Sequence, residues 1–318
     1  SMSQLSTSGQ RRLALSAPAQ GALYMTAAAF CFSVMNYLVR LAAEELNPIE
    51  IAFFRNLFAL AFMLPWLARV GLSGLATRRF PTHAWRALIG LAAMFCWFYS
   101  VALMPLAEAV SLNFTVPLFA TAGAAMILGE TVRARRWTAT AIGFLGVLVI
   151  LRPGFTEVTA LTALPILAAL FMAASTLLVK SLSETESPNA IVFYMNLIVT
   201  PLSLIPALFV WQWPSWTVLG YLVLLGMLAA VAHLVLTRAY TKADASAIMP
   251  FDYTRLPFVA AIAFVAFGEV PDLWTWVGAG IIAASAVYIA HRESRIARAA
   301  ERDRRQVSGA AAVAPRAR

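Results

Sequence analysis

The feature that most restricts the fold of this chain is a succession of ten long apolar segments. Each holds roughly 20 residues, the length that an α-helix needs to cross the hydrocarbon core of a bilayer. Only 12% of the 318 residues are charged, whereas soluble domains usually carry about 25%. We therefore predict an all-α membrane protein with ten transmembrane helices. The expected spans cover residues 20–42, 48–70, 84–104, 107–128, 136–152, 160–181, 188–210, 215–240, 245–267 and 273–290.

A weak internal repeat divides the chain into two halves, because matching residues recur in the same order at an offset of 139 or 140 positions. Each half contains five expected spans, an odd number, so the second half must enter the membrane from the opposite side. Such inverted repeats are typical of secondary transporters, whose substrate sites lie near the bilayer midplane. The matches are Leu38-Val39-Arg40 with Leu178-Val179-Lys180, Pro48 with Pro188, Phe53 with Phe193, Asn56-Leu57 with Asn196-Leu197, Gly129-Glu130 with Gly268-Glu269, and Trp137 with Trp276.

Basic residues lie almost entirely on one side of the expected membrane. If the amino terminus is cytoplasmic, only four of the 24 fall elsewhere: Arg40 and Arg152 on the opposite side, and Arg55 and Arg255 within spans. Because loops rich in Lys and Arg stay in the cytoplasm, we predict both termini there and a multi-pass protein of the bacterial inner membrane. The same bias explains the net charge of +9, so no nucleic-acid partner is expected.

The repeat and the charges together predict the organisation of the chain. Residues 306–318 are expected to be disordered because of their small and polar composition. The predicted units are a disordered cytoplasmic tail over 1–19, a first five-helix repeat over 20–153, a second, inverted five-helix repeat over 160–291, and a basic cytoplasmic tail over 292–318.

Several short motifs accompany the two repeats: Phe53-Phe54-Arg55, then Pro117 with Gly129-Glu130, Pro257 with Gly268-Glu269, and the stretch from Pro250 to Arg255. Together they resemble the EamA type of the drug/metabolite transporter superfamily. The stretch Pro250-Phe251-Asp252-Tyr253-Thr254-Arg255 is similar to the ninth span of a branch that includes proposed riboflavin and S-adenosylmethionine uptake proteins. The resemblance runs from about residue 20 to residue 290 and implies a ten-span carrier of an organic solute.

Ionisable residues inside the spans are the first candidates for a functional site, because burying them in a bilayer is costly. They are Arg55, His233, Asp252 and Arg255, with Glu108 near the non-cytoplasmic start of the fourth span. Asp252 and Arg255 are spaced i and i+3 and can form an ion pair on one helix face. In the alternative interpretation these two residues only neutralise each other, Arg55 ties two helices together through backbone carbonyls, and His233 is a packed partner.

Polar and aromatic side chains near the centres of the spans extend the candidate site. Asn36 and Tyr37 belong to a polar stripe that faces either a cavity or another helix. The substrate is expected between the repeats, against the first, third, fourth, sixth, eighth and ninth spans. The further candidates for substrate binding are Trp97, Tyr99, Asn113, Ser175 and Tyr253.

Arg55 and two further pairs of residues are candidates for a structural or gating role. Gly129 and Gly268 suit the left-handed position that ends a helix, so Glu130 and Glu269 follow predicted helix ends. Pro117 and Pro257 lack a backbone N–H, and we expect each to kink its span.

The missing motifs restrict the activity. The sequence has no GxxxxGK[ST] loop and no nucleophile elbow or metal-ligand spacing, so we expect a gradient-driven carrier without metal or cofactor. An intramembrane enzyme is the remote alternative. The expected partners are a small-molecule substrate, membrane lipid and a coupling ion, for a monomer or a homodimer.

Two classes of transporter remain open, a metabolite carrier and an exporter of drugs or lipophilic cations. Small multidrug proteins of the superfamily use a glutamate in their first span, but residues 20–42 contain no acidic residue. The charges within the spans favour a zwitterionic, anionic or neutral polar solute, such as an amino acid, a vitamin or a nucleoside-like compound.

Overall fold

The computed structural model describes residues 17–127, 134–152, 159–243 and 248–313, which are helical almost throughout and contain no strand. The ten predicted apolar segments are all helical in this part of the chain. The fourth consists of two helices, and the ninth begins as a 3₁₀-helix. The elements are α1 (Ala17–Ala43), α2 (Pro48–Val70), η1 (Leu72–Leu75), α3 (Phe80–Leu103), α4 (Leu106–Asn113), α5 (Val116–Ile127), α6 (Ala134–Leu151), α7 (Ala160–Leu182), α8 (Pro188–Leu208), α9 (Trp216–Lys242), η2 (Met249–Thr254), α11 (Arg255–Phe267) and α12 (Leu273–Val313).

Within the described residues, six helices are by themselves long and apolar enough to cross a membrane: α1, α2, α3, α7, α8 and α9. Shorter apolar helices cover Leu106–Ala120, Trp137–Leu151 and Leu273–Ser285. The chain is thus a multi-pass, all-α membrane protein. The number of spans, their inverted repeat and their direction stay predictions.

Local signals in the sequence explain where the main helices begin and end. Asn47 accepts a hydrogen bond from the Ile49 N–H at 3.0 Å and starts α2, while Ser187 accepts one from the Ala190 N–H at 3.2 Å and starts α8. Each cap is followed by a proline, which needs no hydrogen-bond partner in a first turn. Gly268 ends α11 in the left-handed conformation, with a φ of 66°, as predicted. Its counterpart Gly129 lies outside the described residues.

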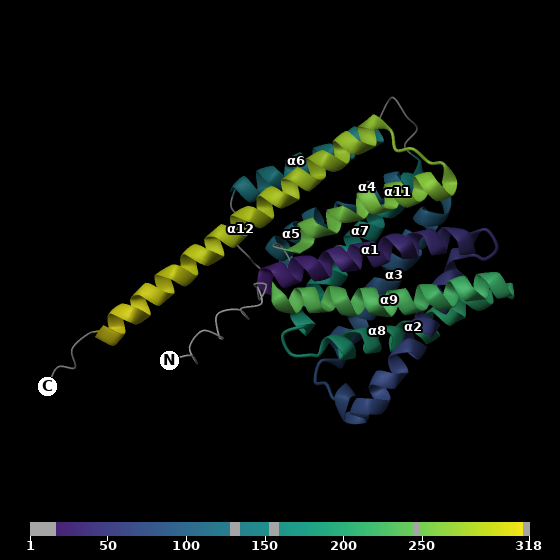
Figure 1. Ribbon diagram of the computed structural model, residues 1–318, viewed down its shortest axis with the longest axis horizontal. Coiled ribbons are helices and arrows are strands. Elements are labelled where there is room, and N and C mark those ends of the chain that lie inside the picture. Colours follow the sequence, from purple (N-terminus) through teal and green to yellow (C-terminus); the bar gives the residue numbers. More distant parts are fainter. Residues whose placement is uncertain (1–16, 128–133, 153–158, 244–247, 314–318) are drawn as a thin grey trace, which may run out of the picture.

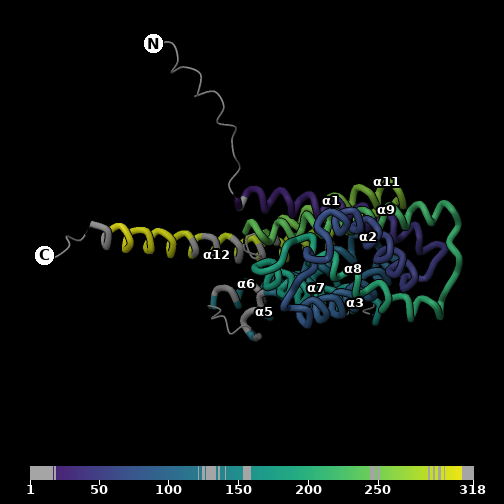
Figure 2. The backbone as a smooth tube through the Cα atoms, turned by 90° about the horizontal axis from the view of Figure 1, so that it is seen from below, coloured from purple at the N-terminus to yellow at the C-terminus, as the bar shows by residue number. Residues whose placement is uncertain are grey.

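Helices of the two halves pack mainly against each other. Helix α1 packs along α9, α2 against both α8 and α9, α3 against α7, and α6 against α12 (Figure 1). The α6–α12 pair needs glycines, because a Cβ atom on Gly146 would lie 2.7 Å from the carbonyl oxygen of Gly278, and one on Gly278 would lie 2.6 Å from that of Gly146. The view in Figure 2 shows α12 continuing well past the bundle.

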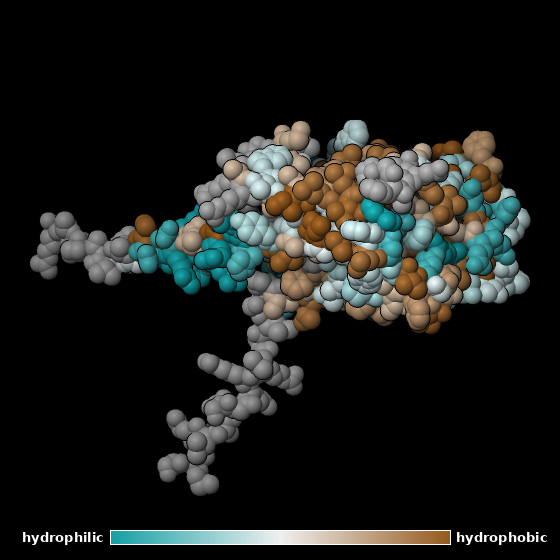
Figure 3. Space-filling view, turned by 90° about the horizontal axis from the view of Figure 1, so that it is seen from above, coloured by the Kyte–Doolittle hydropathy of each residue, from teal (hydrophilic) through white to brown (hydrophobic). Residues whose placement is uncertain are grey.

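The surface of the bundle is apolar, as a lipid-facing surface must be. Large side chains are exposed on several helices, among them Phe30 on α1, Phe62 on α2, Leu145 on α6 and Ile205 on α8. In Figure 3 hydrophobic residues cover much of the bundle, whereas the projecting part of α12 is hydrophilic.

The predicted bounds of the disordered segments at both termini need correction. Residues 17–19 form the first turn of α1, where Pro18 is tolerated because first-turn N–H groups have no helical partner. Residues 306–313 continue α12 instead of being disordered. Alanines there favour a helix, and the preceding turns include a Glu301–Arg305 pair with an N–O distance of 2.5 Å. Residues 1–16 and 314–318 lie outside the described part.

The prediction that Pro117 and Pro257 kink continuous helices is wrong, because each proline lies in the first turn of a helix. Pro117 is the second residue of α5, after an interruption at Phe114 and Thr115, and Pro257 is the third residue of α11, directly after η2. In a first turn a missing N–H costs no helical hydrogen bond. The two prolines therefore begin helices after a break or a 3₁₀ segment, and each predicted span is discontinuous at the corresponding place in its half.

Candidate functional site

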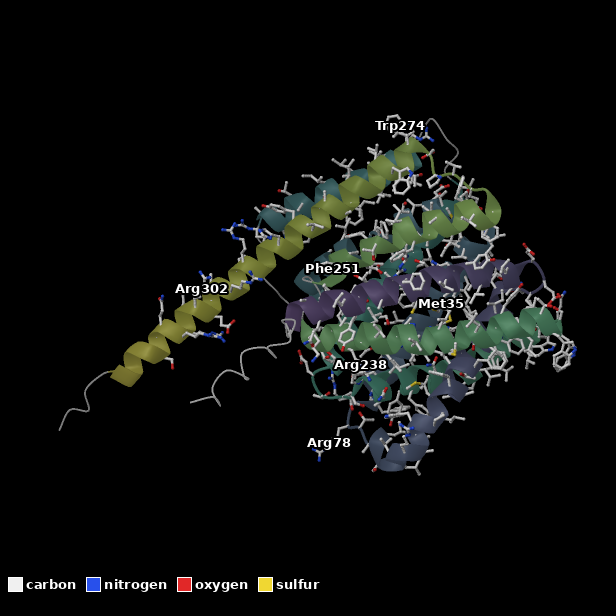
Figure 4. The ribbon with its side chains drawn as sticks, in the orientation of Figure 1. Met35, Arg78, Arg238, Phe251, Trp274 and Arg302 are labelled. Carbon is white, nitrogen blue, oxygen red and sulfur yellow. The ribbon has the colours of Figure 1, made fainter. Side chains whose placement is uncertain are left out.

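A large cavity lies between the helices of the two halves, with about 1200 Å³ of space free of protein atoms, its opening included. Along α1 it extends from Met25 to Val39, about 21 Å at the usual rise per residue. Its described lining comes from α1 to α5 in the first half and from α7, α8, α9, η2 and α11 in the second. Helices α6 and α12 contribute none of these residues. In Figure 4 the lining residue Met35 lies near the middle of the bundle, far from Arg302 on α12.

Most residues predicted for the site line this cavity, and the predicted spans all contribute. Helices α2 and α8, which were not among those spans, add Arg55 and Met195. The predicted residues in the lining are Asn36, Arg55, Trp97, Asn113, Pro117, Ser175, His233, Asp252 and Arg255.

On the first-half side, a buried hydrogen bond organises the wall between α1 and α3. Trp97 Nε1 donates to Asn36 Oδ1 at 3.0 Å, which leaves Asn36 Nδ2 without a partner among the described atoms. Asn113 Nδ2 donates to the Pro165 carbonyl at 3.1 Å and joins the end of α4 to α7.

The predicted ion pair between Asp252 and Arg255 is present, with Arg255 Nη2 2.6 Å from Asp252 Oδ1. It spans the junction of η2 and α11, so the pair lies where one helix type changes into the other. The guanidinium carbon of Arg255 also lies 4.9 Å from the centre of the Phe32 ring on α1. The same wall contains His233, whose ring meets Phe32 edge-on at 5.4 Å.

Arg55 links the two halves at the cavity wall. Its Nη1 donates to Asn56 Oδ1 at 2.8 Å and, more weakly, to Asn196 Oδ1 at 3.5 Å. Asn56 and Asn196 are repeat partners on α2 and α8. Arg55 therefore ties two helices together through amide oxygens, rather than through backbone carbonyls, and lines the cavity as well. Its Nε has no hydrogen-bond partner in the described structure.

Arg86 on α3 is a functional candidate that the sequence analysis missed, because it was assigned to the basic cytoplasmic edge of the third span. It is only 3% exposed and lines the cavity, and its Nε and Nη1 have no described partner. A helical spacing could have identified it, since Arg86, Gly90, Ala93 and Trp97 all line the cavity and share one face of α3.

Three predicted tyrosines are not among the described lining residues. Tyr37 packs on Phe267 at 5.7 Å between ring centres, on a face of α1 turned from that of Asn36. Tyr99 donates to Asn47 Oδ1 at 3.1 Å and so supports the cap of α2. Tyr253 packs edge-on against Phe114 at 4.8 Å.

Glu269 forms an ion pair with Arg40, which directly follows Val39, the last α1 residue of the cavity. Arg40 Nη1 forms an ion pair with Glu269 Oε1, while its other nitrogens donate to the Val101 and Met104 carbonyls at the end of α3. Glu269 Oε2 accepts from the Leu106 N–H at 3.1 Å, at the start of α4. We call these residues the Arg40 cluster. Glu130 lies outside the described residues, and Pro257 does not line the cavity.

A second, more exposed pair lies at the same end. Arg152 Nη2 is 3.1 Å from Asp272 Oδ2, and its guanidinium lies over the Trp274 ring. Partial burial raises the pKa of Asp272, but hydrogen bonds from Thr275 and the charge of Arg152 outweigh it and lower that pKa overall. Asp272 also caps α12 through the Thr275 N–H at 2.7 Å.

Comparison with known sequences gives a consistent family match. The model of the EamA-like transporter family matches twice, over residues 19–152 and 160–290. A riboflavin transporter of Vibrio cholerae is 35% identical over 286 residues, covering 88% of this chain and 96% of the relative. An S-adenosylmethionine uptake transporter of Rickettsia prowazekii is 30% identical over 263 residues, covering 83% and 90%.

Two more similarities extend the comparison. A pseudopaline exporter of Pseudomonas aeruginosa is 30% identical over 275 residues, covering 84% of this chain and 94% of the relative. A solved crystal structure of a protein 17% identical in sequence superposes with a TM-score of 0.63 over 86% of this chain and 98% of the other, and so shares its fold.

Proposed function

Because the chain belongs to the EamA-like transporter family, whose model matches both of its halves, we propose that it transports a small polar organic metabolite across the bacterial inner membrane. The observation that carries the proposal is a cavity to which both halves contribute polar and aromatic residues. Midplane cavities between repeats are where secondary transporters bind their substrates. The relatives are named for three chemically different polar compounds, which supports the class and not one substrate.

The proposed architecture is ten spans in two inverted repeats. Two observations support it besides the double family match. Arg40 donates to the carbonyls of Val101 and Met104 at the end of α3, and its repeat partner Lys180 donates to the carbonyls of Tyr240 and Ala243 at the end of α9, at 3.0 and 3.4 Å. Equivalent residues thus make equivalent contacts in the two halves, as expected if the halves share one fold.

The topology can be tested by labelling single cysteines at the two termini. The native thiols of Cys31 and Cys96 are first replaced by serine, and Ser1→Cys and Arg318→Cys are then made separately. We expect neither terminus to react with a membrane-impermeant reagent in intact cells, and both to react after permeabilisation. Labelling of either terminus from outside would contradict the proposed orientation.

The proposed mechanism is alternating access driven by an ion or solute gradient. The Arg40 cluster lies next to one end of the cavity and joins α1, α3 and the start of α4, so it is the natural candidate for the gate on the non-cytoplasmic side. By repeat equivalence, Lys180 and Glu130 would form its counterpart at the cytoplasmic end. Opening one gate while the other closes would expose the cavity to each side in turn.

The transported class can be tested by ligand-dependent stability of the purified chain. A ligand that binds only the folded state at 100 times its Kd stabilises that state by about 2.7 kcal/mol. Riboflavin, S-adenosylmethionine and amino acids form one set of probes, and tetraphenylphosphonium and ethidium the other. We expect a compound of the first set to raise the melting temperature and to enter proteoliposomes against a gradient. Stabilisation and transport of only the lipophilic cations would instead favour a drug exporter.

A further inference from the structure

Nearly all the unsatisfied polar atoms on the cavity wall are hydrogen-bond donors. Among the described lining residues, the buried nitrogens without a partner are Asn36 Nδ2, Arg55 Nε, Arg86 Nε and Nη1, Arg255 Nε and His233 Nδ1. All but the last are amide or guanidinium nitrogens, which can only donate. A buried donor without an acceptor is unfavourable, so the wall fits a ligand rich in acceptor oxygens.

The charges of the cavity also favour a ligand rich in acceptor oxygens. Three arginines and a single aspartate are found among its described lining residues, and the aspartate is paired with Arg255. Arg55 and Arg86 are 2% and 3% exposed, and neither has a described carboxylate partner. The charge of Arg86 acts on Arg55, and both act on His233, so these groups share one electrostatic environment.

We propose that Arg55 and Arg86 form an anion subsite in this cavity, which binds a carboxylate or phosphate group of the transported metabolite. The proposal rests on the transport function inferred above and narrows its substrate class to solutes that carry an anionic group. Guanidinium groups suit this role, because their planar donors match the oxygens of carboxylate and phosphate.

The proposed subsite differs from the surroundings of the two other arginines, Arg255 and Arg40. Arg255 has Asp252, and Arg40 has Glu269 and two carbonyls, so the charge of each is already matched within the protein. Arg55 donates only to neutral amide oxygens. A substrate anion would supply the opposite charge that these two buried guanidinium groups lack, and it would lower their mutual repulsion.

The first test measures how free anions stabilise the purified full-length chain in detergent at constant ionic strength. Inorganic phosphate or succinate replaces chloride while the melting temperature is followed. We expect a rise of about 3 °C for the wild type at ten times the apparent Kd, and no rise for the double variant Arg55→Gln with Arg86→Gln. No rise in the wild type, or an equal rise in the double variant, would overturn the subsite.

Matched variants keep this test interpretable. Arg78→Gln removes a positive charge from the exposed segment before α3 and should respond like the wild type. Arg86→Lys retains the charge and should keep at least part of the response. If the double variant does not fold, Arg86→Gln alone serves, and its response should fall to half or less. An undiminished response would again contradict the proposal.

A second arm separates soluble anions from lipid headgroups. Phosphatidylglycerol is added to lipid-free micelles in place of the soluble anion. If only the lipid stabilises the chain through Arg55 and Arg86, the site binds lipid and the assignment to a metabolite is wrong. We expect the soluble anions to act without the lipid.

The final arm distinguishes failure of the subsite from failure of the transport function. Riboflavin and riboflavin 5′-phosphate form a matched pair that differs by an anionic group, as do adenosine and its 5′-monophosphate. We expect the charged member of a pair to bind about tenfold more tightly, and the double variant to lose this preference. Anion stabilisation without transport of any metabolite would overturn the function alone, whereas transport without any dependence on the two arginines would overturn the subsite alone.

Discussion

The Arg40 cluster and the cavity both contain buried or half-buried arginines, but the two regions satisfy them in different ways. Arg40 meets a carboxylate and two carbonyls, and the carboxylate of Glu269 in turn meets the N–H of Leu106. Arg55 and Arg86 meet neutral groups or no described partner at all. The first arrangement joins α1, the end of α3, the start of α4 and the segment that follows α11.

The difference suggests how the same residue type serves two purposes in one bundle. A guanidinium whose donors and charge are matched within the chain stabilises the helices that it joins. One whose donors face a cavity costs free energy in the empty protein, and that cost is recovered when a ligand binds. Substitutions in the two regions should therefore have opposite effects on the stability of the empty protein.

The largest effect is expected at the Arg40 cluster. Glu269→Ala removes the carboxylate from a mostly buried arginine and leaves the Leu106 N–H without its acceptor, so we expect a loss of about 2–3 kcal/mol in stability. Thermal unfolding in detergent measures it. Glu269→Gln keeps an acceptor and should lose less. If Glu269→Ala has the same melting temperature as the wild type, the Arg40 cluster does not stabilise the contacts between these helices.

The Asp252–Arg255 pair lines the cavity, but its two charges neutralise each other within the protein. It therefore combines the location of the unpaired arginines with the pairing of the Arg40 cluster. Either Asp252→Leu or Arg255→Leu alone strands one charge and should cost about 2 kcal/mol, whereas the double variant should cost less than either.

The transport activity of the double variant decides what this pair does. We propose that the two residues act in substrate recognition or coupling, so a well-folded double variant should lose uptake or binding. Wild-type transport by that variant would assign the pair to mutual neutralisation. The recognition site would then have to consist of the remaining lining residues, such as Asn36, Trp97 and His233.

A smaller effect of opposite sign is expected for Arg86→Gln. Replacing a buried, unmatched guanidinium by a neutral amide should raise the stability of the ligand-free protein by about 1 kcal/mol. The melting temperature without any added anion other than chloride reports this change. A clear loss of stability would show that Arg86 has a structural partner, and the contrast with the Arg40 cluster would disappear.

The smallest effect is expected for the exposed Arg152–Asp272 pair. Asp272→Asn keeps the cap of α12 and removes the pair, which should cost less than about 1 kcal/mol at neutral pH. Because folding lowers the pKa of Asp272, its contribution is present above the usual aspartate pKa of about 4 and is lost as the pH falls through the lowered value. The stabilities of variant and wild type should therefore converge in acid. A difference that grows as the pH falls would contradict this sign.

The long apolar segments were enough to locate most of the helices, because a helix needs about 20 apolar residues to cross a bilayer. The rarity of polar groups inside spans also identified several of the residues that line the cavity. Arg86 was missed because it is the third residue of the predicted span 84–104, where a basic residue resembles an ordinary cytoplasmic flank. Tyr99 was assigned to the substrate because its true partner, Asn47, is 52 positions away and acts as a helix cap.

The discontinuous helices were also only partly predictable. Pro117 and Pro257 mark an irregularity in each half, but a proline inside an apolar segment is compatible with a kink or with a new helix start. The choice depends on tertiary contacts of the residues before it, such as the packing of Tyr253 on Phe114.

The far end of the long last helix should move when the conformation of the bundle changes. Helix α12 packs on α6 through Gly146 and Gly278 and then continues unbroken to Val313, 41 residues in all. At about 1.5 Å per residue this is a rod of about 60 Å, so a tilt of about 5° moves its far end by about 5 Å. A spin label or fluorophore near the exposed Val307 would therefore be displaced by several ångströms when α12 tilts slightly at the glycine contact.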